Sequence, residues 1–372
     1  MIKKIELNKE FKVPMSQPAF DNETEDFMFD VIKSGWWSQG KKTELFEKNL
    51  SEYFSSNVVA VNNGTSAITA ALMAHGIKSG DKVVVPDYTF IATSSAAKII
   101  GAEVLVADVN PKTLNVKPES IEQLVKQHNV KAVIVVPMSG LPVDLEPIIE
   151  LSNRYKFVLI EDAAQAIGSE YKNKKIGSFD HTTTFSFTAA KIITTVEGGC
   201  VSTGDKEIYE KLLQIRNFGR AGDGQYIHRL NSVNFRFNDI HAALGIKQLE
   251  RINDFVKRRI EISNAYQNNI KNLSFQETPT YATTHSHMLF FAFAKDNETK
   301  EKYLNFLRKN GIDARLPYLP IHRQPCNAEL ANVSCPGADE IYEKALTLPI
   351  YNNMTLDECN LVIDCCNQVE SQ

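Results

Sequence analysis

The runs AVIVVP at residues 132–137 and FVLIED at residues 157–162 decide the fold class of this chain. Both are apolar almost throughout, and a helix-like stretch, LEPIIELSNRY at residues 145–155, separates them. Continuous apolar runs are typical of strands buried on both faces, and in parallel sheets such strands alternate with helices. These residues therefore predict an α/β fold.

The same alternation extends outward in both directions. Strand-like runs at residues 58–61, 83–86 and 103–109 come earlier in the chain, with helix-like stretches between them. Two further runs, at residues 182–187 and 198–204, follow with only a loop between them. The pattern predicts a large domain in which helices flank a mostly parallel sheet.

A second, smaller domain is expected toward the carboxyl terminus. Residues 239–266 predict a long helical stretch that links two domains, and an α+β pattern follows it, with a strand at 288–294 and a helix at 299–311. We place residues 1–255 in the large domain and residues 256–372 in the small one. This division allows the extreme amino-terminal residues to pack on the small domain.

Composition and charge exclude several classes of protein. The chain has 372 residues, of which 23% are charged, and its net charge of −4 gives no support for a nucleic-acid partner. No apolar run approaches the roughly 20 residues that cross a bilayer, and no apolar stretch follows the basic amino end to form a signal peptide. The six cysteines show no C-x-x-C spacing, so we expect reduced thiols in a cytoplasmic protein without a metal site.

A glycine-bearing turn, Asn63-Gly64-Thr65-Ser66, leads from a strand-like run into a helix-like one. Backbone N–H groups at the start of a helix bind anions, and the helix dipole favours this binding. The turn is a candidate cradle for a phosphate group, although taken alone it is more typical of an ordinary helix cap. The sequence contains neither G-x-G-x-x-G after a strand nor a P-loop motif, so a dinucleotide fold is not supported.

Two charged residues have unusual surroundings. Asp162 ends the run FVLIED at the edge where α/β sheets bind ligands, so it could hold a cationic ring nitrogen or cap a helix. Lys191 follows TTTFSF and precedes a glycine pair. Unlike an ordinary surface lysine, an amine in such surroundings has a lowered pKa and can form a Schiff base. Ser186, on the strand before Lys191, has a hydroxyl suited to a second phosphate contact.

An aromatic residue and a polar loop complete the set. Phe90, just after the run at 83–86, could cover the face of a planar cofactor or belong to the core. Asn234 and Arg236 lie in a loop before the long helical stretch, and nothing local assigns them a ligand. An anion cradle, a carboxylate for a ring nitrogen, an aromatic lid and a reactive lysine are together the parts of a pyridoxal phosphate (PLP) site.

Longer segments resemble one known family. They include NNGTSAITAAL at 62–72, PDYTFIATSSAA at 86–97, IEDAAQAIGSEY at 160–171 and FSFTAAKIITTVEGGCVSTGD at 185–205. Over nearly its whole length the chain resembles the DegT-type sugar aminotransferases, PLP enzymes of the aspartate-aminotransferase fold (fold type I) that aminate keto sugars attached to nucleotides. The resemblance implies a large domain with a seven-stranded, mostly parallel sheet flanked by helices, and a smaller carboxyl-terminal α+β domain.

The resemblance also implies the roles of individual residues. It makes Lys191 the Schiff-base lysine and Asp162 the partner of the pyridine nitrogen, and both are then catalytic. It places Gln165 near the ring hydroxyl and Phe90 against the ring. The residues that it assigns to the cofactor phosphate are Gly64, Thr65, Ser66 and Ser186.

A shared active site follows from the same resemblance. Asn234 matches a residue that reaches the phosphate of the neighbouring subunit, which implies a homodimer. Candidate contacts to the substrate are Arg229, Tyr318 and His322. One branch of the family has histidine at the position of Lys191 and dehydrates sugars, so the lysine favours transamination.

The implied activity moves an amino group from L-glutamate, through pyridoxamine phosphate, to a keto group at C3 or C4 of a nucleotide-linked deoxysugar. The product would serve amino-sugar and polysaccharide biosynthesis. The alternatives are an aminocyclitol ketone aminotransferase that uses glutamine, and a regulatory relative without catalysis. Two departures from the family pattern, at Thr188 and at 138–140, bear on substrate shape more than on cofactor binding.

Overall fold

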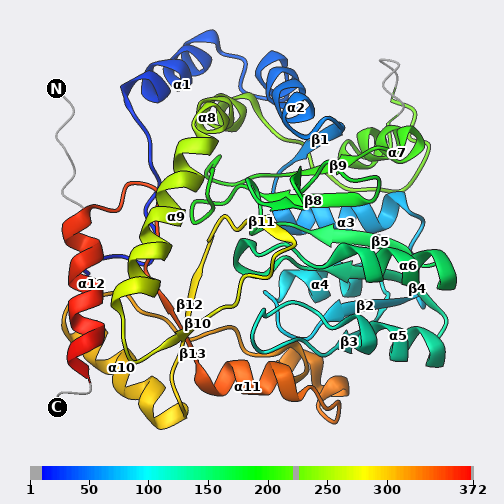
Figure 1. Ribbon diagram of the computed structural model, residues 1–372. Helices are drawn as coiled ribbons and strands as arrows, with labels where there is room; N and C mark the ends of the chain where they lie inside the picture. The colour runs from blue at the N-terminus through cyan, green and yellow to red at the C-terminus, as the bar shows by residue number, and fades with distance from the viewer. Residues whose placement is uncertain (1–10, 221–225, 370–372) are drawn as a thin grey trace.

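A seven-stranded sheet forms the centre of the molecule, whose computed structural model describes residues 11–220 and 226–369 (Figure 1). The strand order is β1-β9-β8-β5-β4-β2-β3. Neighbours from β3 to β8 pair in parallel, whereas β9 runs antiparallel to both β8 and β1. The expected mostly parallel sheet is confirmed. Its strands are β1 (Asn57–Val61), β2 (Lys82–Pro86), β3 (Glu103–Ala107), β4 (Val130–Val135), β5 (Val158–Asp162), β8 (Thr182–Ser186) and β9 (Gly199–Thr203).

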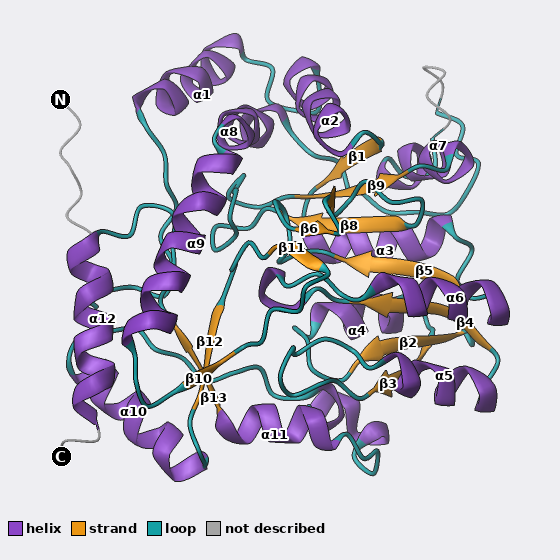
Figure 2. Cartoon of the chain, viewed as in Figure 1, coloured by secondary structure: helices purple, strands orange, loops and turns teal. Residues whose placement is uncertain are grey.

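Both faces of the sheet are apolar and covered by helices (Figure 2). In β1, Val58 and Ala60 belong to one hydrophobic cluster, and Val59 and Val61 belong to the other. Burial on both faces is the reason that these strands appear in the sequence as continuous apolar runs. One face packs on α2 (Lys41–Phe54), α5 (Pro118–Gln127), α6 (Leu145–Tyr155) and α8 (Asp239–Glu250), and the other on α3 (Gly64–Ala74), α4 (Ala92–Ile99) and α7 (Lys206–Arg216).

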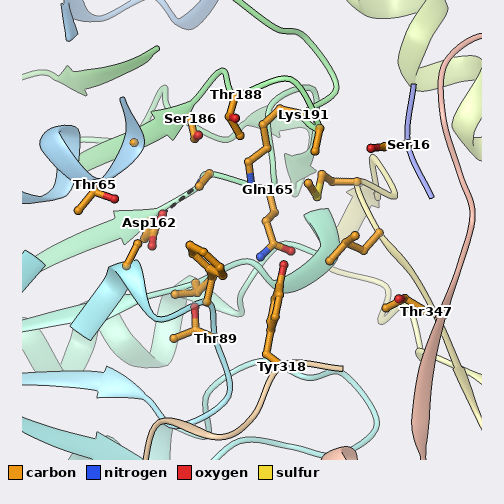
Figure 3. Close-up of a pocket in the computed structure, with 18 of the residues that line it drawn as sticks. Ser16, Thr65, Thr89, Asp162, Gln165, Ser186, Thr188, Lys191, Tyr318 and Thr347 are labelled. Carbon is orange, nitrogen blue, oxygen red and sulfur yellow. Dashed lines mark hydrogen bonds between the residues drawn. The ribbon is translucent and has the colours of Figure 1, made fainter. Parts of the chain in front are cut away.

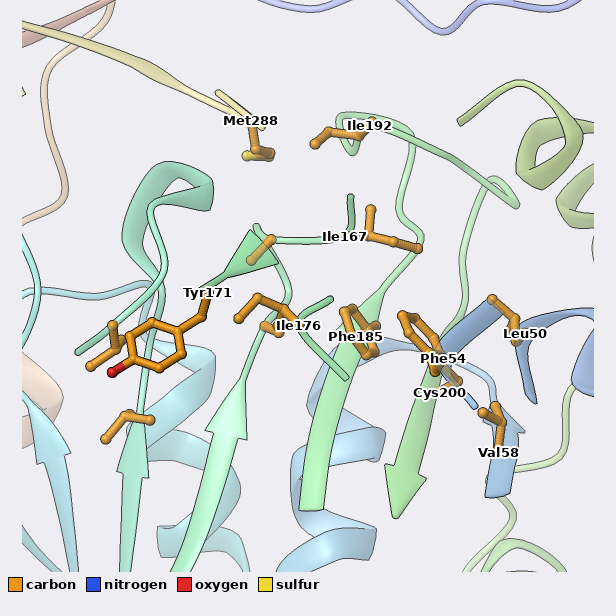
Figure 4. Packing of buried hydrophobic residues seen from close by; sticks show 14 of the residues in the cluster. Leu50, Phe54, Val58, Ile167, Tyr171, Ile176, Phe185, Ile192, Cys200 and Met288 are labelled. Carbon is orange, nitrogen blue, oxygen red and sulfur yellow. The ribbon is translucent and has the colours of Figure 1, made fainter. Parts of the chain in front are cut away.

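Aromatic packing on one face holds β8 in place (Figure 4). Phe54 of α2 stacks on Phe185 of β8, with ring centroids 4.7 Å apart and 13° between the ring planes. Leu50 and Cys200 belong to the same buried cluster. Because side chains alternate along a strand, anchoring Phe185 in this cluster directs its neighbour Ser186 to the opposite face of the sheet.

The carboxyl-terminal part has a hydrophobic core of its own, which joins a small antiparallel sheet to three helices. The chain near the amino terminus also joins it, because Val13 N–H donates to the Gly311 carbonyl at 3.0 Å and Asp313 N–H donates to the Val13 carbonyl at 2.9 Å. Residues 1–10 lie outside the described residues. The elements around this core are β10 (Ser274–Phe275), β12 (Phe290–Phe293), β13 (Ala345–Leu348), α9 (Ile252–Asn269), α10 (Asn297–Lys309) and α12 (Leu356–Gln368).

The helical stretch expected at residues 239–266 is divided into α8 and α9. Arg251 stands between them with φ −105° and ψ 5°, and its guanidinium group pairs with Asp21 at 2.8 Å. No proline or glycine occupies the junction. The division follows from packing instead, since α8 contacts α1 (Asn22–Ser34) and α2 whereas α9 contacts α12.

Within the two described stretches, no helix has both the length and the apolar character needed to cross a membrane. All six cysteines of the chain are free thiols, as expected. The remaining elements are α11 (Pro336–Lys344), β6 (Glu170–Tyr171), β7 (Lys174–Lys175), β11 (Ala282–Thr284) and the short 3-10 helices η1 (Met138–Gly140), η2 (Ile321–Arg323) and η3 (Pro325–Leu330).

Candidate functional site

The carboxyl ends of β2, β5 and β8 open into one cavity of about 430 Å³ (Figure 3). Open α/β sheets bind ligands at this edge of their strands. The opposite wall comes from the carboxyl-terminal part of the chain, chiefly Met288, Leu289, Phe291 and residues 315–318. Of the predicted site residues, the lining includes Gly64, Thr65, Phe90, Asp162, Gln165, Ser186, Lys191 and Tyr318.

The turn at the start of α3 forms a tight cradle on the cavity wall. Asn63 caps the helix by accepting the Ser66 N–H at 2.8 Å. A Cβ added to Gly64 would lie 2.7 Å from the Cβ of Ser186, so only glycine lets the turn approach the end of β8. Gly64, Thr65 and Ser186 therefore surround one space at the positive end of a helix dipole, where a phosphate fits. Ser66 lies outside the lining of this cavity.

Asp162, at the end of β5, is a buried carboxylate whose partners are mostly uncharged. Its side chain accepts the Thr93 hydroxyl at 2.7 Å and the Ala164 N–H at 3.3 Å. Burial raises the pKa of Asp162, whereas these hydrogen bonds and the charge of Lys191 act to lower it. A cation in contact with the carboxylate would offset the cost of burying its charge. The protonated ring nitrogen of PLP is such a cation, so the residue fits the cofactor.

Lys191 projects into the same cavity from the turn that follows β8 (Figure 3). The backbone N–H of Lys191 closes that turn by donating to the Thr188 carbonyl at 2.9 Å. Burial lowers the pKa of Lys191 to about 8, and the Asp162 carboxylate opposes the shift. About a tenth of the amine is then neutral at pH 7, far more than for an ordinary lysine, and a nucleophile requires this neutral form.

Three further side chains shape the space between Asp162 and the opposite wall. The Oε1 atom of Gln165 accepts the Ser139 N–H at 2.8 Å, which fixes the orientation of the amide. Phe90 is 53% exposed although it lines the cavity, which argues against a core role for its ring. Tyr318 meets Phe90 edge to face at 5.6 Å, and its hydroxyl end points toward Gln165 (Figure 3).

Three of the predicted site residues do not line the cavity of the single chain. Arg229 is exposed outside the lining. Asn234 is also exposed, and its side-chain oxygen accepts the Arg236 N–H at 3.1 Å. His322 is 7% exposed and its ring pairs with Asp87, so in this structure the ring is turned away from the cavity.

Sequence reasoning missed several residues of this site. Arg315 lines the cavity, and a bidentate pair with Asp313, at 3.0 and 2.7 Å, holds its guanidinium group. Thr93 contacts Asp162 directly, and the pattern of hydroxyls in TFIAT, directly after a strand, could have indicated it. No local signal marks Arg315, because a different part of the chain brings it to the sheet edge.

Comparison with known proteins agrees with this geometry. A model of the DegT/DnrJ/EryC1/StrS aminotransferase family matches residues 18–367. The chain belongs to that family. It is a PLP-dependent aminotransferase of fold type I, as its sequence predicted.

Individual relatives cover nearly the whole chain. The GDP-perosamine synthase of Escherichia coli O157:H7 is 32% identical over 361 residues, which span 96% of this chain and 99% of the relative. Helicobacter pylori PseC, an aminotransferase involved in the biosynthesis of pseudoaminic acid, matches with a TM-score of 0.90 and 26% identity over 97% of this chain and all of its own. S. venezuelae DesV, solved in complex with a ketimine intermediate, matches with a TM-score of 0.89 and 27% identity over 97% of this chain and 99% of its own.

Proposed function

We propose that this aminotransferase moves an amino group from L-glutamate to a keto group, at C3 or C4, of a nucleotide-linked deoxysugar in amino-sugar and polysaccharide biosynthesis. The observation that carries the proposal is that Asp162 and Lys191 face one cavity beside the cradle of Gly64 and Thr65. The name of the GDP-perosamine synthase supports a nucleotide-linked amino sugar as the product. We place the reaction in the cytoplasm, which the six free thiols support.

The chemistry divides between the cofactor and two side chains. PLP, when bound, supplies an electron sink for the reacting carbon. Lys191 would hold the cofactor covalently through Nζ until the amino donor displaces it. The freed amine, with a pKa lowered to about 8, would take a proton from the donor carbon as a base and return it as an acid. Asp162 would keep the proton on the ring nitrogen, because a buried carboxylate favours a cation beside it.

The remaining contacts would orient the cofactor. Gly64, Thr65 and Ser186 would bind its phosphate at the start of α3. Gln165 Oε1 accepts the Ser139 N–H, and the amide nitrogen of Gln165 donates one N–H to Met138 Sδ at 3.7 Å. The second N–H of the amide would donate to the ring hydroxyl. Phe90 would cover one face of the ring.

The opposite wall would bind the substrates. Arg315 is a cation with its orientation fixed by Asp313, and guanidinium groups suit both carboxylates and diphosphates. L-Glutamate and a nucleotide sugar both bring such anions. Tyr318, whose pKa burial and the Asp162 charge raise to about 12, stays protonated and would donate a hydrogen bond.

A homodimer with shared sites completes the proposal. A second groove adjoins the phosphate cradle and is lined by Thr65, Ser66 and residues 231–233, with Ile99 72% exposed at its edge. A second copy of the chain would cover this groove and bring its own Asn234 and Arg229 to the neighbouring site. Mixing Lys191→Ala with Asn234→Ala chains should restore part of the activity that each variant lacks alone. Equal inactivity of the mixture and of the separate variants would exclude sharing.

A direct test begins with the visible spectrum of the purified protein loaded with PLP. Borohydride reduction followed by peptide mapping should place the cofactor on Lys191. Adding L-glutamate should change the spectrum, and glutamine serves as the competing donor. The loaded protein should then aminate a member of a panel of nucleotide keto sugars, with aminocyclitol ketones as the competing acceptors. Turnover with glutamine and a cyclitol ketone alone would replace the proposed function by its alternative.

A further inference from the structure

Among the residues that the structure describes, two histidine–carboxylate pairs are buried, and the first joins distant segments. Asp87 is fully buried just after β2, and His322 lies 235 residues along the chain from it in η2. The Asp87 carboxylate accepts the His322 backbone N–H at 2.8 Å and stands 2.5 Å from His322 Nδ1. The Asp87 carbonyl also accepts the Ile321 N–H at 2.7 Å. Asp87 thus clamps the segment around His322 to the end of β2.

Both ends of this clamp lead directly into the cavity wall. Asp87 belongs to the same short segment as Thr89 and Phe90, which line the cavity. On the other side, His322 follows the segment 315–318, which lines the cavity from the opposite direction. The two segments touch where Tyr318 meets Phe90 at 5.6 Å. The clamp therefore joins the two segments that carry Phe90 and Tyr318, while Asp87 and His322 themselves do not line the cavity.

The clamp is better explained by hydrogen bonding than by a metal ion. The ligand atoms of Asp87, His322 and Cys335 lie within 4.8 Å of one another, as in a metal site. However, two atoms bound to one tetrahedral zinc at about 2.0–2.1 Å would stand roughly 3.3 Å apart. The separation of 2.5 Å between Asp87 and His322 Nδ1 is too short for two ligands of one zinc and is instead that of a short, direct hydrogen bond.

We propose that Asp87 and His322 are positioning residues that hold the Tyr318 hydroxyl in place for the substrate. This inference rests on the proposed function and changes the role expected for His322, from a contact with the sugar to a support of the residue that makes the contact. Rotating a tyrosine hydroxyl away from its acceptor loses a hydrogen bond without removing any group from the cavity. The effect should therefore appear in substrate binding and not in the chemical step.

A second buried pair provides a matched control. His181 Nε2 stands 3.1 Å from Glu161 Oε2, and the side chains are 8% and 0% exposed, against 7% and 0% for His322 and Asp87. Neither His181 nor Glu161 lines the cavity. Replacing either histidine by glutamine should lower thermal stability to a similar extent. Only the change at His322 should alter substrate binding.

The decisive experiment is a double-mutant cycle on the PLP-loaded enzyme. We expect His322→Gln and Tyr318→Phe each to raise the KM for the nucleotide keto sugar about tenfold, with kcat changed less than about twofold. Because His322 acts through Tyr318, the KM of the double variant should be no higher than that of Tyr318→Phe alone. His181→Gln combined with Tyr318→Phe should show the KM of Tyr318→Phe. Equilibrium binding of GDP-perosamine, and of UDP- and dTDP-linked amino deoxysugars, should follow the same pattern.

Each other outcome has a defined meaning. Additive effects of the two substitutions, or an unchanged KM in His322→Gln, would overturn the positioning role while leaving the proposed function intact. Wild-type enzyme that binds none of the three nucleotide sugars would overturn both. If His322→Gln does not fold, Asp87→Asn keeps the acceptor for the His322 N–H and should give a smaller rise in KM of the same kind. Stoichiometric Zn²⁺ binding lost in His322→Gln would replace the clamp by a metal site.

Discussion

The two walls of the cavity are built in different ways. One wall consists of groups at the ends of sheet strands, such as Asp162 after β5 and Ser186 on β8, with Lys191 in the turn beyond. The other consists of a connecting segment that carries Arg315 and Tyr318 and is held by pairs with Asp313 and Asp87. Strands buried on both faces fix the first wall rigidly, whereas the second depends on side-chain contacts. We propose that the sheet wall carries the cofactor chemistry and that the connecting segment recognises the substrate.

The strongest test of this division removes the reactive amine. Lys191→Ala should lower kcat by about 10,000-fold, because Lys191 is the only lysine among the described residues that line the cavity and proton transfer loses its catalyst. The PLP-loaded protein should also lose the borohydride-trapped peptide. Lys206→Ala, at an exposed position on α7, is the control and should retain full activity. An active alanine variant would remove Lys191 from the sheet wall's chemistry.

A second change on the sheet wall neutralises the carboxylate beside the ring nitrogen. Asp162→Asn keeps an oxygen that can accept the Thr93 hydroxyl but no longer favours a cation, so kcat should fall by about 100- to 1,000-fold. The KM for the keto sugar should change little. The exposed Asp180→Asn is the matched control. A rise in KM with kcat preserved would contradict the separation of the two walls.

The pH dependence sharpens the role of Lys191. Burial lowers its pKa to about 8, so the neutral, basic form of the free amine gains population as the pH rises through that value. Proton removal by Lys191 should therefore speed up about tenfold between pH 7 and pH 9 and then level off. Rapid-mixing measurement of the reaction between the PLP-loaded enzyme and L-glutamate, repeated at a series of pH values, would show a rate that is half-maximal near pH 8. A rate independent of pH across this range would indicate another base.

In the connecting segment, the expected effect is on KM rather than on kcat. Arg315→Gln should raise the KM for each anionic substrate about tenfold while leaving kcat within about twofold, because it loses a charge-assisted contact formed equally before and during reaction. Arg315→Lys should give an intermediate value. The control is Arg154→Gln, whose side chain is 62% exposed and pairs with Glu122 outside the lining. A large fall in kcat would instead indicate that Arg315 takes part in the chemical step.

The prediction from sequence succeeded where a signal was local. The strands are visible as apolar runs because both of their faces are buried, and Asp162 is visible because it ends such a run. Gly64 is visible because the turn must approach Ser186 closely. The division of residues 239–266 at Arg251 was missed, since it depends on which helices pack against each half.

By itself, the sequence determined the α/β sheet, the order of its strands along the chain and the groups at the ends of the strands. Each of these depends on the periodicity of neighbouring residues or on the residue that follows a strand. Only the tertiary structure decided that Arg315 reaches the cavity and that His322 turns away from it to hold Asp87. Contacts between residues so far apart in the chain leave no periodic pattern, because their position is set by how the two parts of the molecule pack together.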